Sequence, residues 1–289
     1  MTLSASGMQP ETQEPIGIIA GSGQFPRLVA ENARACGLNP VICGFFGNTD
    51  SLLEHSAHAF TMVHLGQFGK MLTFLRSHRV RRICFAGAIN KPKAFDIRPD
   101  WMAAKIIFSL RGKGDDALLR AIIRAFEKEG FSVVGAAELA PGLLCPAGQL
   151  TRLKPSDEAW EDIRYAWPIA AVMGNYDIGQ SLVVKKGVVV AVECLEGTDA
   201  TLRRGGELGG EGCVAIKVFK PGQDHRVDLP SFGLETIRIL VEYKYQCLAV
   251  SAHNTLFFDR EAALAEADAH GLSVIALEGD GAPLPEVLK

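Results

Sequence analysis

The stretch IGIIAGSGQFPRLVAENARACG, residues 16–37, constrains the fold more than any other part of this chain. It begins with an apolar run typical of a buried strand and continues through a glycine turn. A helical pattern follows, in which Pro26 suits the first turn. Strand and helix patterns keep alternating through the first half, which predicts an α/β domain with a mostly parallel, doubly wound sheet. Ligands of such sheets bind beyond the carboxyl ends of the strands.

The elements of the first half follow from apolar periodicity. Strands are expected at the apolar runs 16–20, 40–45, 61–65, 81–89 and 131–136. A helix is expected where four apolar residues have helical spacing, namely Phe68, Met71, Leu72 and Leu75. Another is expected in GDDALLRAIIRAFEKEGF, with Asp115 or Asp116 as its cap and Gly130 at its end. Its apolar stripe consists of Leu118, Leu119, Ile122, Ile123 and Phe126.

A domain boundary is expected near residues 137–156, where prolines interrupt short apolar steps. The chain is therefore divided into a disordered tail, an N-terminal α/β domain, a linker and a second α/β domain with a mixed sheet, at residues 1–14, 15–140, 141–155 and 156–289.

The second half begins with a helix expected at 156–174, before two strands around a Lys-Lys-Gly turn in SLVVKKGVVVAVECL. The stretch EGTDATLRR is followed by a glycine-rich gap and then by the apolar run CVAIKVF. The C-terminal part predicts helix, strand, helix and strand, at 233–243, 246–251, 259–269 and 272–277.

Composition excludes several classes of protein. The 289 residues carry a net charge of −3, which gives no reason to expect a nucleic-acid partner. The seven cysteines are dispersed without a C-x-x-C pair, as is typical of reduced thiols in a cytosol. The opening residues lack the pattern of a signal peptide, and no apolar run reaches the roughly 18 residues of a membrane span. The histidines show no zinc-hydrolase spacing, and no G-x-S-x-G elbow is present.

Two glycine loops of the first half are candidate ligand sites. GSGQFP, with Gly21, Ser22 and Gly23, is placed to contact a phosphate at a helix N-terminus, or it is a plain tight turn. It is neither a Walker A loop nor a complete dinucleotide fingerprint. FAGAINKP, with Gly87 and Ala88, contacts a ligand or is an ordinary loop. In KGDDALLR the paired acids bind a metal or cap the helix.

Three polar stretches of the second half are stronger candidates. DIGQ (177–180) and EGTDA (196–200) both place a carboxylate beside a glycine at the end of an element, with Thr198 as a candidate N-cap. KPGQDHRVDLP (220–230) places charges between two prolines, and this loop neutralises phosphate or is a solvated, salt-bridged loop. Its residues Asp224 and Asp228, together with Asp199, are candidates for holding Mg²⁺, a cation that prefers oxygen ligands.

Taken in order, GIIAGSGQFP, FAGAINKP, KGDDALLR, EKEGF, DIGQ, VECLEGTDA and KPGQDHRVDLPSFGLETI resemble the UDP-2,3-diacylglucosamine pyrophosphatase family of the lipid A pathway, the LpxI type. The resemblance covers nearly the whole chain after the tail. It implies a Rossmann-like N-terminal domain, a C-terminal catalytic domain, and Mg²⁺-dependent hydrolysis of UDP-2,3-diacylglucosamine to UMP and 2,3-diacylglucosamine 1-phosphate (lipid X). The family's essential aspartate falls on Asp228, whereas Ser22 and Phe25 depart from the usual first loop.

The residues and the resemblance together give a mechanistic expectation. Water attacks the α-phosphorus while Mg²⁺, or Mn²⁺ in its place, bridges the diphosphate and the carboxylates, with Asp228 the first ligand and Asp199 and Asp224 as assistants. The loops are expected to hold the substrate between the domains. The expected substrate-binding residues are Gly21, Ser22, Gly23, Gly87, Ala88, Asp177, Ile178, Gly179, Gln180, Gly197, Thr198, Lys217, Lys220 and Arg226.

The expected partners are the lipid-linked nucleotide sugar and the inner-membrane surface, at which a cytoplasmic protein would act peripherally. WMAAKIIFSL (101–110) is the candidate wall for the acyl chains, or an ordinary core helix. A homodimer is left open. Two other functions also stay open at this point: a nicotinamide- or nucleotide-dependent oxidoreductase and a non-catalytic lipid- or nucleotide-binding protein.

Overall fold

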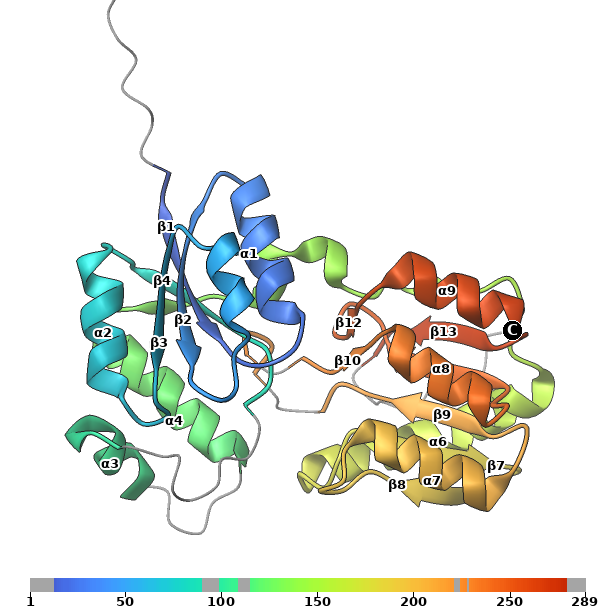
Figure 1. The fold of residues 1–289 in the computed structure, drawn as a ribbon. Helices are drawn as coiled ribbons and strands as arrows, with labels where there is room; N and C mark the ends of the chain where they lie inside the picture. The colour runs from blue at the N-terminus through green and yellow to red at the C-terminus, as the bar shows by residue number, and fades with distance from the viewer. Residues whose placement is uncertain (1–12, 90–98, 109–114, 221–223, 228, 280–289) are drawn as a thin grey trace, which may run out of the picture. The chain divides into compact units, whose positions relative to one another are not determined.

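The structure is a computed structural model that describes residues 13–89, 99–108, 115–220, 224–227 and 229–279 (Figure 1). The chain divides into two compact units, Met1–Ala140 and Pro141–Lys289. Residues 1–12 of the expected tail lie outside the described residues.

The described part of the first unit contains a five-stranded sheet in the order β3-β2-β1-β4-β5. Its strands are β1 (Pro15–Ala20), β2 (Asn39–Phe45), β3 (Ala59–Val63), β4 (Arg82–Ala86) and β5 (Ser132–Val133). All neighbouring strands pair in parallel, with Ile18 of the central β1 opposite Ile42 on one side and Cys84 on the other. This order is that of a doubly wound sheet and confirms the predicted α/β class.

Helices cover both faces of this sheet (Figure 1). Their bounds are α1 (Phe25–Ala35), η1 (Ser51–Ser56), α2 (Phe68–Ser77), α3 (Trp101–Phe108), α4 (Asp115–Lys128) and α5 (Ala136–Leu139). Helix α1, η1 and α5 bury apolar residues against one face. On the other face, Phe126 of α4 lies with ring centroids 4.6 Å from Phe68 of α2 and 5.8 Å from Phe85 of β4.

The predicted helical stripes are largely confirmed. All four apolar residues predicted for α2 are buried, as are Ile123 and Phe126 of α4. Leu118, at the first turn of α4, is 39% exposed, so the stripe begins later than its spacing suggested. The side chains of Asp115 and Asp116 lie outside the described residues, and Gly130 has the left-handed conformation (φ 89°) expected after a helix end.

The described part of the second unit contains a mixed six-stranded sheet in the order β6-β13-β11-β9-β7-β8, and a two-stranded sheet of β10 and β12. The strands are β6 (Gly148–Gln149), β7 (Ser181–Lys185), β8 (Val188–Val192), β9 (Val214–Lys217), β10 (Ser231–Phe232), β11 (Cys247–Ser251), β12 (Leu256–Phe257) and β13 (Ser273–Leu277). Strands β9, β11 and β13 are parallel, whereas β7, β8 and β6 pair antiparallel. The predicted mixed sheet is thereby confirmed.

Helix α6 (Asp157–Asn175) covers one face of the large sheet through a core that includes Ile163, Trp167 and Ile216. The opposite face is covered by α7 (Thr198–Gly209), α8 (Leu234–Glu242) and α9 (Arg260–Ala269). A short 3-10 helix, η2 (Pro141–Leu143), begins the unit. Among the described residues, no helix combines the length and the apolar character needed to cross a bilayer.

Helix α7 corrects the prediction of a glycine-rich gap after EGTDATLRR. Three glycines, whose presence predicted a loop, lie inside this helix. Each lets the helix backbone come close to a neighbouring residue, at a distance that a methyl group would prevent. A Cβ on Gly205 would lie 2.5 Å from Val183 Cγ2, and one on Gly206 would lie 2.5 Å from Tyr243 Cβ. The glycines therefore fit α7 against the sheet and α8, at the cost of helix propensity.

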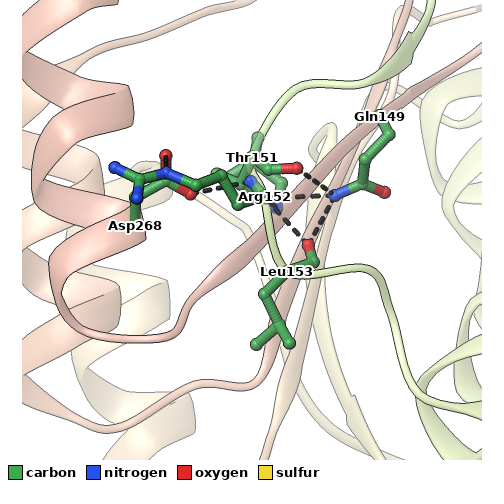
Figure 2. A network of polar contacts seen from close by, with 6 residues as sticks. Gln149, Thr151, Arg152, Leu153 and Asp268 are labelled. Carbon is green, nitrogen blue, oxygen red and sulfur yellow. Dashed lines mark hydrogen bonds and ion pairs between the residues drawn. The ribbon is translucent and has the colours of Figure 1, made fainter.

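Residues 141–155, the expected linker, belong to the second unit and are fixed to its sheet by side-chain contacts (Figure 2). Gln149 Nε2 donates to the carbonyl oxygens of Thr151 and Leu153, at 3.1 and 2.6 Å. The Thr151 hydroxyl accepts from the backbone N–H of Val274 in β13 at 2.8 Å. Arg152 donates from its backbone and its guanidinium to Asp268 of α9. These contacts satisfy polar groups that a free linker would expose to solvent.

Candidate active site

In the first unit, the loops after β1 and β4 are joined through one carbonyl oxygen. The Ala88 oxygen accepts from the Ser22 backbone N–H at 2.7 Å, the Ser22 hydroxyl at 2.9 Å and Asn48 Nδ2 at 3.1 Å. A Cβ on Gly21 would lie 2.4 Å from this oxygen, and one on Gly87 (φ 86°) would lie 2.5 Å from the Ser22 carbonyl oxygen. These two glycines are therefore explained by loop packing.

Gly23 differs from its neighbours in this loop. It is exposed, has φ 84°, and a Cβ at this position would meet no heavy atom within 4 Å. The structure thus places Gly21, Ser22, Gly23, Gly87 and Ala88 together at the carboxyl edge of the first sheet, as predicted. Phosphate contact by this edge stays a prediction.

In the second unit, four elements bring polar residues to one edge of the large sheet. Lys217 ends β9 and pairs in register with Ser181, the first residue of the antiparallel β7. Glu193 directly follows β8, and Thr198 begins α7. We call these residues, with Gln180, the second-unit edge. Because β9 and β7 run in opposite directions, the end of one and the start of the other meet here.

The side chains of the second-unit edge form a hydrogen-bonded chain. Lys217 Nζ donates to the Thr198 hydroxyl at 2.6 Å, and that hydroxyl donates to Glu193 Oε1 at 2.9 Å. Glu193 Oε2 accepts the backbone N–H of Gln180 at 3.2 Å. The Ser181 hydroxyl lies 3.3 Å from the Thr198 hydroxyl. Lys217 is 4% exposed and Glu193 is 8% exposed, so both charged groups are largely removed from water.

Two glycines predicted to bind substrate support this arrangement through the backbone. A Cβ on Gly179 would lie 2.3 Å from the Glu193 carbonyl oxygen, so any larger residue would push the DIGQ loop away from β8. Gly197 has φ 81° and is the N-cap of α7. The prediction of Thr198 as N-cap is wrong, because Thr198 is the first helical residue and its hydroxyl is engaged by Lys217 and Glu193.

The DIGQ loop also contacts the start of the charged loop. Asp177 has a left-handed backbone (φ 54°), and its Oδ1 accepts from Lys220 Nζ at 2.8 Å. A Cβ on Gly174 would lie 3.2 Å from Lys220, so the end of α6 packs closely on this lysine. Ile178, between these polar residues, is 46% exposed.

Within the charged loop, Arg226 and Asp224 pair with each other. Arg226 Nη2 lies 2.7 Å from Asp224 Oδ2, and the Arg226 backbone N–H and Nε also donate to this carboxylate. These hydrogen bonds hold the pKa of Asp224 below its usual range. His225 stacks on Phe219 at 4.2 Å between ring centroids. Asp228, the expected catalytic residue, lies outside the described residues.

The predicted metal ligands do not form a cation site among the described residues, where no three acidic, histidine or cysteine side chains are grouped for a metal. Asp224 is engaged by Arg226, and Asp199 Oδ1 accepts from the Thr236 hydroxyl at 3.4 Å. Asp199 and Asp224 alone therefore do not supply the oxygen ligands of a complete Mg²⁺ site.

Gln180 offers an acceptor that the fold leaves unused. Its side-chain oxygen is buried and receives no hydrogen bond from any residue that the structure describes. A buried carbonyl oxygen without a donor is costly, and such atoms are therefore few in folded proteins. The predicted substrate-binding residue Gln180 thus keeps an acceptor without a donor among the described residues, and ligand contact by this oxygen stays a prediction.

The candidate acyl-chain segment forms α3 as far as Phe108, and residues 109–110 lie outside the described residues. Trp101, at its start, is 75% exposed, whereas Ala103 is buried. Lys105 Nζ lies 5.0 Å from the centre of the Trp101 ring. The exposed Trp101 is not part of the core, and a role in acyl-chain binding stays a prediction.

Sequence reasoning missed Glu193, although it lies in the quoted stretch VECLEGTDA. The signal that would have found it is a lone carboxylate directly after an apolar hairpin strand, between two motifs already singled out. Ser181 was missed for a related reason, because a small hydroxyl residue at a strand start is unremarkable until its register with Lys217 is known.

Comparisons with known proteins agree with this architecture. The LpxI N-terminal domain family matches residues 15–143, and the LpxI C-terminal domain family matches residues 146–275. A protein of Caulobacter vibrioides, named UDP-2,3-diacylglucosamine pyrophosphatase LpxI, is 37% identical over 280 residues, which cover 93% of this chain and 99% of that protein. The solved N5-carboxyaminoimidazole synthetase of Staphylococcus aureus is 16% identical over 63% of this chain and 41% of its own, with a TM-score of 0.23. Because the two LpxI domain families match both halves of the chain and the similarity extends over nearly all of it, this protein belongs to the LpxI family.

Proposed function

We propose that this protein hydrolyses UDP-2,3-diacylglucosamine to UMP and 2,3-diacylglucosamine 1-phosphate in lipid A biosynthesis. The observation that carries the proposal is the 37% identity, over 93% of the chain, to a protein named for this pyrophosphatase activity. The match of both family domains supports it over the whole length of the fold.

The reaction sets a clear electrostatic requirement. A water oxygen forms a bond to the α-phosphorus while the bond from this phosphorus to the bridging oxygen breaks. UMP keeps the water oxygen, and the leaving sugar 1-phosphate keeps the bridging oxygen. Because negative charge grows on the phosphoryl and leaving oxygens, preorganised cations and hydrogen-bond donors lower the barrier.

The second unit supplies such groups. Lys217 at the end of β9 and Lys220 three residues later bring two ammonium groups to the region of the DIGQ and EGT loops. Arg226 adds a guanidinium group that forms an ion pair with Asp224. The unused oxygen of Gln180 is suited to accept from a hydroxyl or N–H group of the nucleotide sugar. We assign these residues to substrate binding.

Activation of the water is assigned to Asp228, on the resemblance of RVDLP to the family stretch that holds an essential aspartate. Mg²⁺ dependence, with Mn²⁺ as a substitute, is part of the proposal because a hard cation with oxygen ligands would neutralise the diphosphate. Asp228 is its first proposed ligand. Asp199 and Asp224 do not complete a cation site among the described residues.

The substrate carries two acyl chains, so the protein must reach it at a lipid surface. We propose a cytoplasmic enzyme that acts peripherally at the inner membrane, and we assign the exposed Trp101 to contact with the lipid part of the substrate. Trp101→Ala is expected to slow turnover of dispersed diacylated substrate more than turnover of a deacylated analogue. Equal losses on both would reduce Trp101 to a structural role.

The deciding experiment is a ³¹P NMR assay of purified protein with UDP-2,3-diacylglucosamine in water enriched in ¹⁸O. UMP and the sugar 1-phosphate should appear together, with the ¹⁸O label in UMP. Label in the sugar phosphate would place the attack on the β-phosphorus, and absence of turnover would overturn the proposal in favour of a binding protein. NADH fluorescence that changes on titration would instead favour an oxidoreductase.

A further inference from the structure

Glu193 joins the two polar loops of the second-unit edge. Its Oε1 accepts from the Thr198 hydroxyl at 2.9 Å, and its Oε2 accepts from the Gln180 backbone N–H at 3.2 Å. Its own backbone N–H donates to the Ser181 carbonyl oxygen at 2.9 Å. The Glu193 carboxylate therefore holds the DIGQ loop and the start of α7 at fixed spacing, while its backbone is tied to the start of β7.

The direction of the hydrogen bonds follows from the chemistry of the groups. An ammonium group only donates, and an ionised carboxylate only accepts. The Thr198 hydroxyl has a single proton, so it donates that proton to Glu193 and accepts from Lys217 Nζ at 2.6 Å. The Ser181 hydroxyl, 3.3 Å from the Thr198 hydroxyl, can donate to the second lone pair of that oxygen. The chain from Lys217 through Thr198 to Glu193 then runs in one direction and orients the Lys217 ammonium group.

Stability alone is a poor explanation for this arrangement. Moving an ammonium and a carboxylate out of water is costly, and replacing a buried ion pair by apolar residues of similar volume often leaves a protein as stable or more stable. Lys217 is 4% and Glu193 8% exposed, and the three residues before Lys217 in β9 are apolar. The pair lies at the edge where the proposed function needs a fixed positive charge.

We propose that Glu193 is a positioning residue for the reaction, which acts through Thr198 to hold the Lys217 ammonium group in place for the diphosphate. This inference rests on the proposed function. Glu193 does not touch the substrate in this scheme. Its carboxylate is required because two donors, the Thr198 hydroxyl and the Gln180 N–H, need two acceptors.

Glu193→Gln tests this requirement with little change in shape. A glutamine side chain has one acceptor oxygen and one amide nitrogen that only donates, so one of the two hydrogen bonds is lost. Thr198→Val removes the hydroxyl while keeping the volume, and Thr198→Ser restores it. We expect Glu193→Gln and Thr198→Val each to lower kcat about 10- to 100-fold, as misplaced catalytic groups do. Thr198→Ser should stay within about threefold of the parent by the same reasoning.

Matched controls lie elsewhere in the same unit. Glu242 of α8 pairs with Arg203 at 2.9 Å, and Thr151 is a buried threonine whose hydroxyl accepts from the Val274 backbone N–H at 2.8 Å. Glu242→Gln and Thr151→Val repeat the same chemical changes away from Lys217. Both should keep kcat near the parent value, and a loss equal to that of the Glu193 variant would overturn the inference.

Two further readouts separate positioning from simple structure. The double variant Glu193→Gln/Thr198→Val should lose little more than either single variant, because both act on one chain of contacts. NMR of the Lys217 side-chain amine should show a protected ¹⁵N–¹H signal in the parent that is lost in both single variants but kept in Thr198→Ser. Full kcat in Glu193→Gln, or independent losses in the double variant, would overturn the proposal. If the parent protein shows the protected amine signal but does not hydrolyse the substrate, the proposed function is wrong, and the hydrogen-bonded chain itself is still supported.

Discussion

Lys220 Nζ lies 2.8 Å from Asp177 Oδ1, so one ion pair joins the DIGQ loop to the charged loop that begins 43 residues later. The Lys220 side chain is 15% exposed and packs on Gly174 at the end of α6. The pair orients the lysine, while Asp177 (42% exposed) stays accessible to water. Two segments that sequence patterns selected separately are thus in contact in the fold.

Removal of the Lys220 charge is expected to weaken handling of the diphosphate. Lys220→Met should lower kcat/KM about 10- to 1,000-fold, the range seen when one preorganised donor to a developing charge is lost. Asp177→Asn keeps an acceptor for the lysine and suits the left-handed backbone, so it should cost at most about tenfold by the same measure. Steady-state kinetics on the diacylated substrate measure both.

The control for Lys220→Met is Lys154→Met, which removes an exposed lysine of the same unit. It should leave kcat/KM unchanged. Equal activity of Lys220→Met and the parent, with both variants folded by circular dichroism, would remove Lys220 from the site.

Most of the fold could be predicted because its signals are local. Apolar runs gave the strands of the first sheet and most strands of the six-stranded sheet, and helical spacing gave the buried face of α2. The two-residue strands β6, β10 and β12 were not predicted. Helix α7 could not be predicted, because its glycines are placed for contacts with Val183 and Tyr243, which lie far away in the sequence. Such contacts override helix propensity and leave no trace in the segment itself.

The site was predicted in part for the same reason. Thr198 was recognised beside a glycine and Lys217 as a cation that could neutralise phosphate, and the structure brings the Lys217 Nζ to 2.6 Å from the Thr198 hydroxyl. Glu193 was missed because its importance comes from the pairing of β7 with β8, which places it beside Gln180 and Thr198. Pairing between strands depends on register, which a single sequence pattern does not determine.

The close packing of α7 predicts an unusual response to a helix-favouring substitution. Alanine in place of glycine in an exposed helix interior gains about 1 kcal/mol. Here a Cβ on Gly205 would lie 2.5 Å from Val183 Cγ2 and 2.9 Å from the Tyr245 hydroxyl. We expect Gly205→Ala to lower the free energy of unfolding of this unit by about 1–3 kcal/mol, as overpacking does. Urea unfolding followed by circular dichroism measures the shift.

Gly142→Ala is the matched control for Gly205→Ala, because a Cβ at that position meets no heavy atom within 4 Å. Its midpoint should remain close to that of the parent. A Gly205→Ala protein that unfolds at a higher urea concentration than the parent would show that α7 can move away from the sheet without cost.

The seven cysteines should separate into two classes by reactivity. Cys36 and Cys194 are exposed, and the other five are buried. Burial raises the pKa of Cys43, Cys84, Cys145 and Cys247 to about 12, so these thiols stay protonated and shielded at pH 8. Alkylation of the native protein at pH 8, followed by peptide mass spectrometry, should modify Cys36 and Cys194 first. Rapid modification of Cys84 or Cys247 would contradict the packing of the corresponding strands.

Chelation tests the proposed metal. Activity should vanish in excess EDTA and return when Mg²⁺ or Mn²⁺ is added, because the cation neutralises charge on the diphosphate. Ca²⁺ prefers more ligands and longer bonds, so it should restore less activity. Full turnover in EDTA would exclude the metal and leave Lys217, Lys220 and Arg226 as the groups that offset the phosphate charge.

Asp228→Ala is the most direct test of the assigned chemistry. The residue is a short acid between Val227 and Leu229 in a loop bracketed by Pro221 and Pro230. If it activates water or binds the metal, its removal should lower kcat by several orders of magnitude, at about tenfold per 1.4 kcal/mol of lost transition-state stabilisation. If it only forms a surface ion pair, the loss is limited to ~0–1 kcal/mol of stability, and turnover persists.

The comparison is Asp224→Asn, which disrupts the pair with Arg226 and should cost far less activity, because that carboxylate is already engaged within the loop. The substrate should still bind to Asp228→Ala, and the melting temperature should match the parent. Release of UMP at the parent rate by a folded Asp228→Ala protein would show that the KPGQDHRVDLP loop does not carry the catalytic acid.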